Sequence, residues 1–430
     1  MGKFGGKKLL VLGTSVGSVD IVKYAKAEGA HVLVADYLPV EKSAAKQLAD
    51  DTAMVSTLDV QALCDLVKQH HIDGVFCGVS EANIQSARKV CEISGLPTYY
   101  TDEQWNTFMN KDSFRELCRK YGVGVPTTYF TGSREQFDAV GSEGLCIEYP
   151  VIVKPVDNGA NVGISVCLSR ETLMEAMEFA FRNSDAGKAI VEQFVNGIEI
   201  SPTYVVQNGR CELVCMGSKY AYENASGLKA LSHAYIYPAP SPCLDEYLQD
   251  VDSHVKDMVL SQGINNCTIF FQGIYSDHKF YIFEAGLRME GTATFRITKR
   301  MGGNSFMEFM TDNALGVQSD YDISREDVTF GGRKCVIFSM ISTGGIIGRV
   351  EGFEEAAAHP MVVASEQRHQ VGEHVANDGT LRQIMFRFVL QDDDLDNVLD
   401  TIRFIQNTVK AYDQEGNYML ITGFDPEMMR

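Results

Sequence analysis

The first hundred residues alternate between strand-like and helix-like segments, and no other feature constrains the fold as strongly. Segments 7–13, 31–37 and 73–79 contain continuous apolar runs with the length of buried strands. Helical patterns follow the first and the last of them, over 18–30 and 83–95. Strands and helices in alternation form a parallel sheet with right-handed crossovers. The pattern therefore predicts an open α/β domain at the start of the chain.

The turn after the first strand carries Gly13 and Gly17, as nucleotide-binding turns do. A dinucleotide site needs Gly-x-Gly-x-x-Gly there and an acidic residue at the end of the second strand. Asp36 meets the second requirement, but Ser15 stands where the middle glycine is needed. A nucleotide-linked dehydrogenase is therefore an alternative, although it leaves the segments described next unexplained.

Residues 149–164 (YPVIVKPVDNGANVGI) combine a short apolar strand, a lysine and a glycine-rich loop. The strand Val151–Val153 leads into Lys154, and Gly159 and Gly163 follow in the loop. Glycine lets the backbone approach an anion, which free N–H groups and one ammonium then attract. The layout suits a polyphosphate, although an ordinary hairpin with a Gly-Asn-rich turn would have the same residues.

A β-hairpin is predicted over 268–290, where FFQGIY and KFYIFEA flank the turn Ser-Asp-His. Gln272 and Glu284 are the polar residues of these apolar strands, and a polar side chain buried there needs a partner or a cavity. Oxygen ligands on neighbouring strands suit Mg²⁺, which also takes phosphates and water. Arg288 could hold a transferring phosphoryl group. The alternative is a polar pair on a half-exposed sheet.

Two further segments could complete a nucleotide site. Lys111 begins a helix capped by Asn110 or Asp112 and could supply a second cation, although spacing alone favours a solvated lysine. In VEQFVNGIE, backbone groups of an extended hinge could contact a purine edge and a carboxylate could accept from ribose hydroxyls; an edge strand with exposed glutamates is the alternative. The hinge residues concerned are Glu192, Phe194, Val195 and Glu199.

The composition argues against several classes of protein. The net charge of −19 disfavours a general nucleic-acid or anionic-membrane surface. No apolar run approaches the ~18–20 residues of a membrane span, and the first apolar run is too short for a signal peptide. The 11 cysteines are scattered, which fits reduced thiols better than a disulfide framework. We therefore expect a cytoplasmic protein of two to four domains.

Together and in this order, the segments resemble the ATP-grasp superfamily, in the carboxylate–amine ligase branch with L-amino-acid ligases, biotin carboxylase and carbamoyl-phosphate synthetase. The resemblance covers essentially the whole chain. It is carried by Asn-Lys-Asp at 110–112, VIVKP with the loop DNGANVG, the hinge EQFVNGIE, and Gln272 with Glu284-x-x-x-Arg288.

The resemblance implies a multidomain fold with α/β and α+β parts. A Rossmann-like domain would cover 1–105, and the small ATP-grasp lobe, with the glycine loop and the adenine hinge, would cover 106–200. The large lobe with the metal site would cover 201–330, and an α+β subdomain 331–430.

The resemblance also implies a role for each candidate residue. Lysines and the glycine loop would bind the phosphates of ATP, the hinge would line the adenine, and a glutamate would bind the ribose. The phosphate-binding residues would be Lys111, Lys154, Gly159 and Gly163. The residues that line the adenine would be Glu192, Phe194 and Val195, and Glu199 would bind the ribose. Glu284 and Gln272 would hold Mg²⁺ or Mn²⁺, while Arg288 and Lys154 would be catalytic.

One departure concerns the metal. The family usually has Glu-x-Asn-x-Arg, but glycine occupies the asparagine position here, as Gly286. Glycine offers no side chain to a second ion. Either one ion is held more loosely, Glu290 or water takes the place, or the chemistry is weakened. A non-catalytic ATP-binding homologue is therefore a further alternative.

The implied reaction has two steps. A carboxylate attacks the γ-phosphate of ATP, and an amine takes the resulting acyl-phosphate to give an amide, ADP and phosphate. The loop from Gly159 to Gly163 and the segment 223–242 are candidate lids, because water must be kept from the intermediate. Amino acids or small peptides are the expected substrates, and a homodimer through the N-terminal domain is expected.

Overall fold

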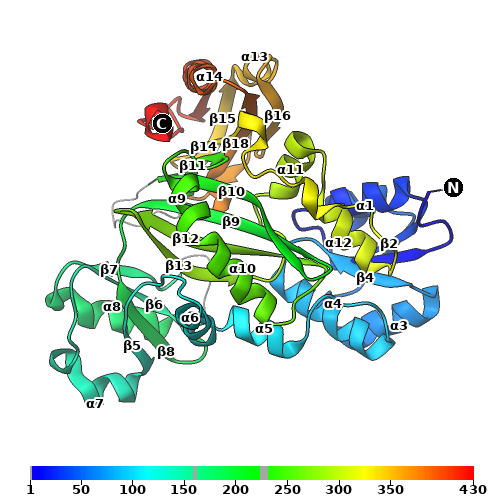
Figure 1. Cartoon of the computed structure of the whole chain (residues 1–430). Coiled ribbons are helices and arrows are strands. Elements are labelled where there is room, and N and C mark those ends of the chain that lie inside the picture. The colour runs from blue at the N-terminus through cyan, green and yellow to red at the C-terminus, as the bar shows by residue number, and fades with distance from the viewer. Residues whose placement is uncertain (1, 158–161, 223–230) are drawn as a thin grey trace.

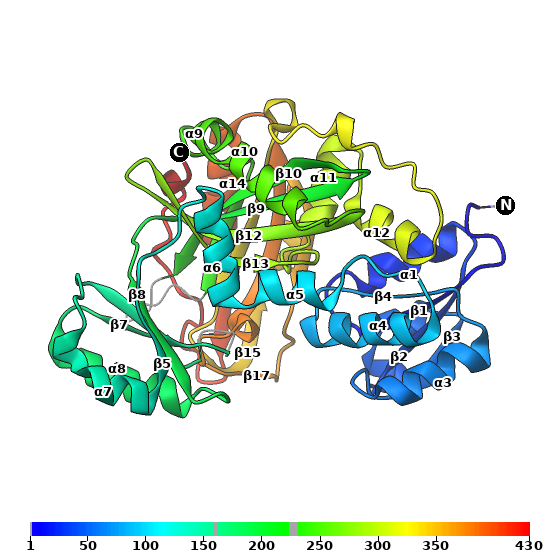
Figure 2. The same cartoon turned by 60° about the horizontal axis from the view of Figure 1, so that its bottom comes forward.

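The computed structural model describes residues 2–157, 162–222 and 231–430. An N-terminal domain and a small lobe lie at opposite ends of the molecule, with a large sheet and its helices between them, as Figures 1 and 2 both show. Gly159 and residues 223–230 of the second candidate lid lie outside the described residues. The four domain boundaries expected from the sequence stay predictions.

The N-terminal domain is the parallel α/β sheet that its alternating segments predict. The strand order is β3-β2-β1-β4 and every pairing is parallel. The apolar run Leu9–Leu12 is fully buried, as expected for a strand covered by helices on both faces. The strands are β1 Lys8–Leu12, β2 His31–Asp36, β3 Asp51–Met54 and β4 Gly74–Cys77, and the helices are α1 Ser18–Ala27, α2 Ala44–Leu48, α3 Val60–His70 and α4 Glu81–Ser94.

Helices α5 (Asp102–Met109) and α6 (Lys111–Lys120) connect this domain to the small lobe. The side chain of Asn110 caps α6, accepting hydrogen bonds from the N–H groups of Asp112 (3.0 Å) and Ser113 (3.1 Å). Of the two caps expected from the sequence, the structure therefore uses Asn110. The cap makes Lys111 the first residue of α6.

The small lobe is an antiparallel sheet with the order β5-β8-β6-β7. Val151 and Val153 of β6 are fully buried in a core shared with α8, so the alternating side chain of Lys154 lies on the other face of the sheet. The strands are β5 Thr128–Ser133, β6 Val151–Pro155, β7 Ser165–Cys167 and β8 Lys188–Gln193, and the helices are α7 Arg134–Gly144 and α8 Arg170–Arg182.

The centre of the molecule is an eight-stranded sheet with the order β13-β12-β9-β10-β11-β14-β18-β16. The turn at Asn208 and Gly209 joins β9 to β10 with positive φ angles of 51° and 76°, as the Asn-Gly pair predicts. The strands are β9 Ile198–Gln207, β10 Arg210–Tyr222, β11 Leu231–Tyr237, β12 Cys267–Ser276, β13 Lys279–Gly286, β14 Lys334–Ile341, β16 Val362–Gln367 and β18 Ile384–Asp392. The helices of this region are α9 Cys243–Asp250, α10 Asp252–Ser261, α11 Thr294–Gly302 and α12 Phe306–Ala314.

The end of the chain extends this sheet and adds a small layer of its own. The strands β14, β16 and β18 belong to the eight-stranded sheet, so its hydrogen bonding continues across residue 330. The added layer has the strand order β17-β15-β19. Its elements are β15 Gly345–Glu351, β17 His374–Val375, β19 Lys410–Asp413, α13 Phe353–Ala357 and α14 Leu395–Thr408.

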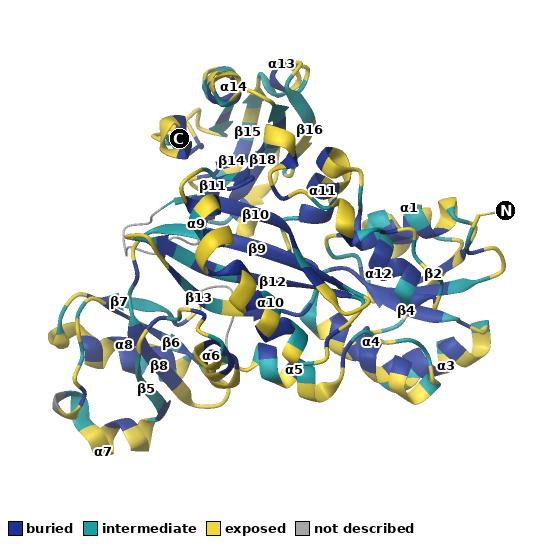
Figure 3. Cartoon of the chain, viewed as in Figure 1, coloured by how far each residue is buried: buried dark blue, intermediate teal, exposed yellow. Residues whose placement is uncertain are grey.

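The buried side chains form three clusters. Figure 3 marks which residues of each element are buried. The first runs from the N-terminal domain into the central sheet without interruption, the second lies in the C-terminal part, and the third is confined to the small lobe. The small lobe therefore has a core separate from the rest. Within the described ranges, no helix has the length and apolar character to cross a membrane.

Candidate functional site

Lys154 and Glu192 form the centre of the candidate site. In the pairing of β6 with β8, Lys154 lies opposite Ile190 and Ile152 lies opposite Glu192. The lysine and the glutamate are therefore diagonal neighbours on one face of the sheet. Lys154 Nζ lies 2.6 Å from Glu192 Oε2, and the side chain of Glu192 is only 1% exposed.

Arg115 pairs with the other carboxylate oxygen of Glu192 through its Nη2, and its side chain is also 1% exposed. Two cations on one buried carboxylate leave an excess of positive charge, which suits an anionic ligand. Arg115 is not among the residues expected from the sequence. It lies four residues after Lys111 in α6, so the helical spacing was a signal that both side chains share one face.

Lys111 supplies a third cation. Its Nζ lies 3.5 Å from the carbonyl oxygen of Pro155, at the end of β6. Burial and the charge of Lys154 lower the pKa of Lys111 below its usual value of 10.5, while Glu284 and Glu192 act in the opposite direction. The fold therefore brings Lys154, Glu192 and Glu284 within electrostatic reach of Lys111.

The hairpin of β12 and β13 places Gln272 directly opposite Glu284. Glu284 is exposed and Gln272 is half-buried, so oxygen atoms of both can reach a ligand. Across the described ranges, no group of three or more His, Cys, Asp or Glu side chains could enclose a metal ion. A pair of oxygen donors fits an ion such as Mg²⁺ that brings phosphate and water ligands with it.

The structure explains why residue 286 is a glycine. It lies opposite Phe270 in the hairpin, and a Cβ atom at residue 286 would lie 2.1 Å from Cε1 of the Phe270 ring. The ring therefore occupies the space into which the asparagine of a Glu-x-Asn-x-Arg pattern would project. The same ring lies 4.9 Å from Cζ of Arg288, within the range of a cation–π contact.

Glu290, the candidate replacement metal ligand, is buried and makes its contacts elsewhere. One of its carboxylate oxygens pairs with the hydroxyl of Ser201. Burial raises the pKa of Glu290, and the hydrogen bond from Ser201 opposes this shift. No contact in the described part of the chain places it beside Gln272 or Glu284.

Arg288 connects the hairpin to the N-terminal domain. Its Nε and Nη2 donate to one carboxylate oxygen of Glu81, at 3.2 and 2.9 Å, and its Nη1 donates to the carbonyl oxygen of Met289 at 2.9 Å. Glu81 is the first residue of α4 and was missed from the sequence. Its position at the carboxyl end of a parallel strand was the available signal, because ligands of such sheets bind there.

The hinge after β8 is held by backbone hydrogen bonds. The N–H of Gln193 donates to Thr127 (2.8 Å) and the N–H of Phe194 donates to Pro150 (3.1 Å). Phe194 is half-buried and Val195 is buried. The N–H of Phe194 is therefore engaged within the protein.

Glu199 lies on β9 and has a cationic neighbour that the sequence did not reveal. Its Oε2 lies 2.6 Å from Nζ of Lys219, which is directly opposite on β10. Burial alone would lower the pKa of Lys219, but Glu199 and its other anionic neighbours raise it. Glu199 would therefore have to bind the ribose while it is ion-paired with Lys219.

The structure argues against a dinucleotide site. Asp36 is buried, and its carboxylate lies 3.6 Å from Nζ of Lys46, which is buried as well. Lys46 also donates to the carbonyl oxygen of Asp36 at 2.8 Å. The acid that a dehydrogenase would use for the ribose is thus engaged inside the N-terminal domain.

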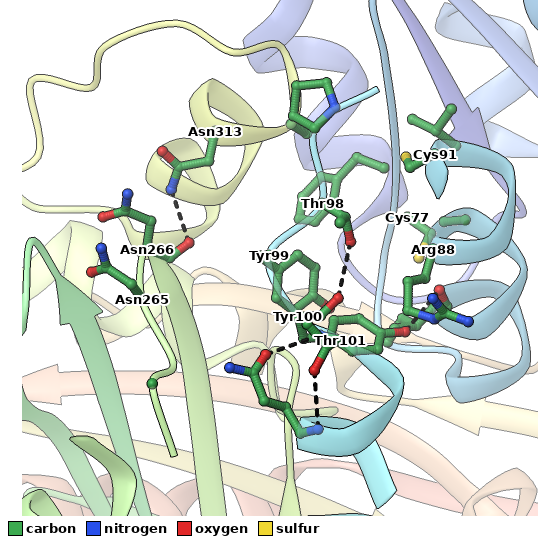
Figure 4. Close-up of a pocket in the computed structure, with 18 residues that line it drawn as sticks. Cys77, Arg88, Cys91, Thr98, Tyr99, Tyr100, Thr101, Asn265, Asn266 and Asn313 are labelled. Carbon is green, nitrogen blue, oxygen red and sulfur yellow. Dashed lines mark hydrogen bonds between the residues drawn. The ribbon is translucent and has the colours of Figure 1, made fainter. Parts of the chain in front are cut away.

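Two cavities lie near these elements. One, of about 720 Å³, reaches Lys111 from the side of α5 and β5. The other, of about 390 Å³, lies between α4 and the asparagines Asn265, Asn266 and Asn313, with Cys77 and Arg88 in its wall (Figure 4). It contains none of the residues expected to bind ATP, so we assign it no part in the site.

Known proteins share this architecture. The family model described as D-ala D-ala ligase C-terminus matches residues 124–285. An L-amino acid ligase from Bacillus licheniformis superposes with a TM-score of 0.76 at 18% identity, over 95% of this chain and 99% of that one. The phosphoribosylglycinamide synthetase from Anaerococcus prevotii gives a TM-score of 0.72, also at 18% identity, over 95% and 99%. The chain has the ATP-grasp fold, which confirms the resemblance of its motifs.

A curated relative is more similar in sequence over a shorter stretch. The formate-dependent phosphoribosylglycinamide formyltransferase of Erythrobacter litoralis (strain HTCC2594) is 29% identical over 194 residues, which is 44% of this chain and 48% of that protein. The match therefore spans about half the length of the relative.

Proposed function

We propose that this protein is an ATP-dependent ligase that activates a carboxylate as an acyl-phosphate and joins it to an amine, releasing ADP and phosphate. The observation that carries the proposal is the convergence of Lys111, Lys154, Glu192 and Glu284, from four separate segments, on one site. A formyltransferase that depends on formate and an L-amino acid ligase are among the similar proteins, and both names fit such chemistry.

In this proposal, Lys111 and Lys154 bind the phosphates of ATP together with Gly163. Gly159, which the sequence assigns to the same role, lies outside the described residues. The hinge residues Phe194 and Val195 line the adenine. Glu192 holds Lys154 and Arg115 in place behind the nucleotide, and Glu199 contacts the ribose. Glu192 is given this supporting role because its carboxylate already pairs with two buried cations.

Gln272 and Glu284 would hold Mg²⁺ or Mn²⁺, which when bound offsets negative charge on the phosphates. Lys154 and Arg288 would act on the transferring group. The carboxylate oxygen forms a bond to the γ-phosphorus as the bond from that phosphorus to the β-phosphate oxygen breaks. The amine then attacks the acyl carbon, phosphate leaves, and the amine loses a proton. Positioning and charge stabilisation would supply most of the rate enhancement.

We propose amino-acid-like substrates, because the fold is shared with an L-amino acid ligase over nearly the whole chain. We also propose a cytoplasmic location, since all 11 cysteines are free and ten of them are buried. The acidic net charge of −19 supports small-molecule substrates rather than nucleic acid. A homodimer through the N-terminal domain is part of the same proposal.

The test measures ADP release with a panel of carboxylates and amines, and identifies the condensed product by mass spectrometry. We expect ADP release that needs both a carboxylate and an amine. Glu284→Ala should abolish it while the circular dichroism spectrum stays unchanged, whereas the exposed, distant Glu354→Ala should behave like the wild type. Wild-type turnover by Glu284→Ala would show that the metal assignment is wrong.

A non-catalytic ATP-binding protein is the second candidate, because the Phe270 ring stands where the second metal ligand of the family would be. This candidate predicts ATP binding without ADP release for every member of the panel. NADH binding without ATP binding would contradict both candidates.

A further inference from the structure

Asp157 occupies an unexpected position for an acidic residue. It lies three residues after Lys154 in the sequence, and it shares with Lys111 the wall of the cavity of about 720 Å³. Both lysines are proposed to bind phosphates, and a carboxylate near them would repel the same ligand. The acid at this position therefore needs an explanation other than contact with the ligand.

The carboxylate of Asp157 is engaged within the small lobe. Its Oδ1 accepts a hydrogen bond from the hydroxyl of Ser184 at 2.8 Å, and its Oδ2 accepts one from the N–H of Ala186 at 2.5 Å. Both donors belong to the turn between α8 and β8, which lies beside β6 in the small lobe (Figure 1). Each carboxylate oxygen thus has its own partner on a segment 27 or 29 residues later in the chain.

The turn that receives this carboxylate has hydrogen bonds of its own. The hydroxyl oxygen of Ser184 accepts from the N–H of Lys188 at 3.0 Å, and the carbonyl oxygen of Ser184 accepts from the N–H of Gly187 at 3.2 Å. The N–H of Val156 donates to the carbonyl oxygen of Lys188 at 3.2 Å. The segment that leaves β6 is therefore joined to a preformed turn by its backbone as well as by a side chain.

Gly163 contacts the same turn at the later end of the glycine-rich segment. Its φ angle is 79°, in the left-handed region that favours glycine. A Cβ atom at residue 163 would lie 2.7 Å from Cβ of Asn183 and 2.6 Å from Cγ of Pro155. Asp157 and Gly163, on either side of the residues that are not described, therefore both rest against residues 183–186.

We propose that Asp157 is a positioning residue, which binds the turn between α8 and β8 and thereby fixes Lys154 and Gly163 for the phosphates of ATP. This role deepens the proposed function and rests on it. A support that is formed before the ligand arrives reduces the conformational freedom lost on binding. That gain outweighs the repulsion from one exposed carboxylate, because water and salt screen an exposed charge.

The test removes the carboxylate, because positioning and repulsion predict changes of opposite sign. Calorimetric titration of the full-length protein with ATP should show that Asp157→Ala binds about tenfold more weakly than the wild type. Loss of repulsion alone would instead strengthen binding. Asp185→Ala is the matched control and should bind like the wild type. It removes the same charge from the same turn, and the exposed side chain of Asp185 has no hydrogen bond or ion pair within the described ranges.

Two further measurements separate positioning from general damage to the lobe. Ser184→Ala removes one of the two hydrogen bonds, so it should weaken ATP binding less than Asp157→Ala does, and the two effects should not add. Adenosine carries no phosphate, so Asp157→Ala and the wild type should bind it equally.

The proposal is overturned if Asp157→Ala binds ATP as tightly as the wild type or more tightly, or if it loses affinity for ATP and adenosine alike. Should Asp157→Ala fail to fold, Ser184→Ala decides the question by the same comparison. The expected pattern of ATP binding without ADP release in any panel would contradict only the ligase. ADP release with unaltered ATP affinity in both variants would contradict only the role of Asp157, and absence of ATP binding by the wild type would contradict both.

Discussion

At the scale of single residues, Gly286 and Phe270 show how one side chain excludes another. The two residues face each other across the hairpin, and the ring fills the space beside the glycine. The ring is then available to Arg288, which lies against its face. The missing asparagine is thus linked to the placement of an arginine that the reaction is proposed to use.

Gly286→Asn should therefore destabilise the protein instead of restoring a metal ligand. The new Cβ would meet the Phe270 ring at 2.1 Å, and such overpacking typically costs about 1–3 kcal/mol. Urea unfolding gives the change in the free energy of unfolding. Gly302→Ala is the control, because a Cβ there meets nothing within 4 Å. Equal stability of Gly286→Asn and the wild type would show that the ring does not hold this space.

Lys111 should make ATP binding sensitive to alkaline pH. Its pKa is lowered from 10.5, chiefly by burial and then by Lys154. The lysine is charged below this lowered pKa and attracts phosphate, and the attraction is lost as the pH rises through it. Calorimetric titration should show that ATP binding weakens at a lower pH than it would if Lys111 had the pKa of an ordinary lysine. In Lys111→Arg the loss should move to higher pH, and an unchanged profile would contradict the assignment.

Some site residues could be predicted from the sequence because their positions follow from local structure. Gln272 and Glu284 belong to one hairpin, so the turn alone places them opposite each other. Local signals place Arg115 on the same helix face as Lys111 and Glu81 at the carboxyl end of a parallel strand, but their partners Glu192 and Arg288 lie on elements far away in the sequence. Their roles depend on how domains pack, which no local pattern encodes.

At the scale of elements, α6 positions two of the cations. Lys111 is its first residue and Arg115 lies one turn later, and the cap of Asn110 determines where the helix begins. The parallel sheet, the Asn-Gly turn and this helix all agree with their sequence patterns. The pairing of β14 and β18 with the central sheet was not foreseen, because strands that meet across long connections carry no signal of their partner.

Asn110→Ala should lower stability by about 1 kcal/mol, the usual cost of losing such a cap, and should also weaken ATP binding. Asp394→Ala removes a similar cap from α14, where the side chain accepts from the N–H of Asp396 at 2.9 Å, far from the candidate site. Thermal unfolding and ATP titration of both variants check the expectation. If the two caps affect ATP binding alike, α6 does not position the cations.

At the scale of the whole molecule, the distribution of the core indicates which part can move. The N-terminal domain and the central sheet share one buried cluster, whereas the small lobe has its own. Separating the first two would expose the apolar surface of their shared cluster, whereas the core of the small lobe stays intact when the lobe changes its position. Motion during ATP binding should therefore fall mainly on the small lobe.

Hydrogen exchange should detect this difference. We expect amides of β6 and β8 to exchange faster than those of β1 and β2, because a small separate core opens at a lower free energy. Addition of ATP should slow exchange in β6 and β8 more than in the N-terminal sheet. Mass spectrometry of peptides resolves both effects. Uniform protection across the two sheets would mean that the cores unfold as one unit.

The shared space of Gly286 and Phe270 also bears on how such a protein can evolve. An asparagine gained at residue 286 meets the ring, and a smaller residue gained at 270 removes the surface against which Arg288 lies. Each single change is therefore disfavoured alone, although the pair of changes together could be tolerated. A lineage that has taken this arrangement is separated from its relatives by an intermediate that selection would remove, so the two forms should persist as distinct groups.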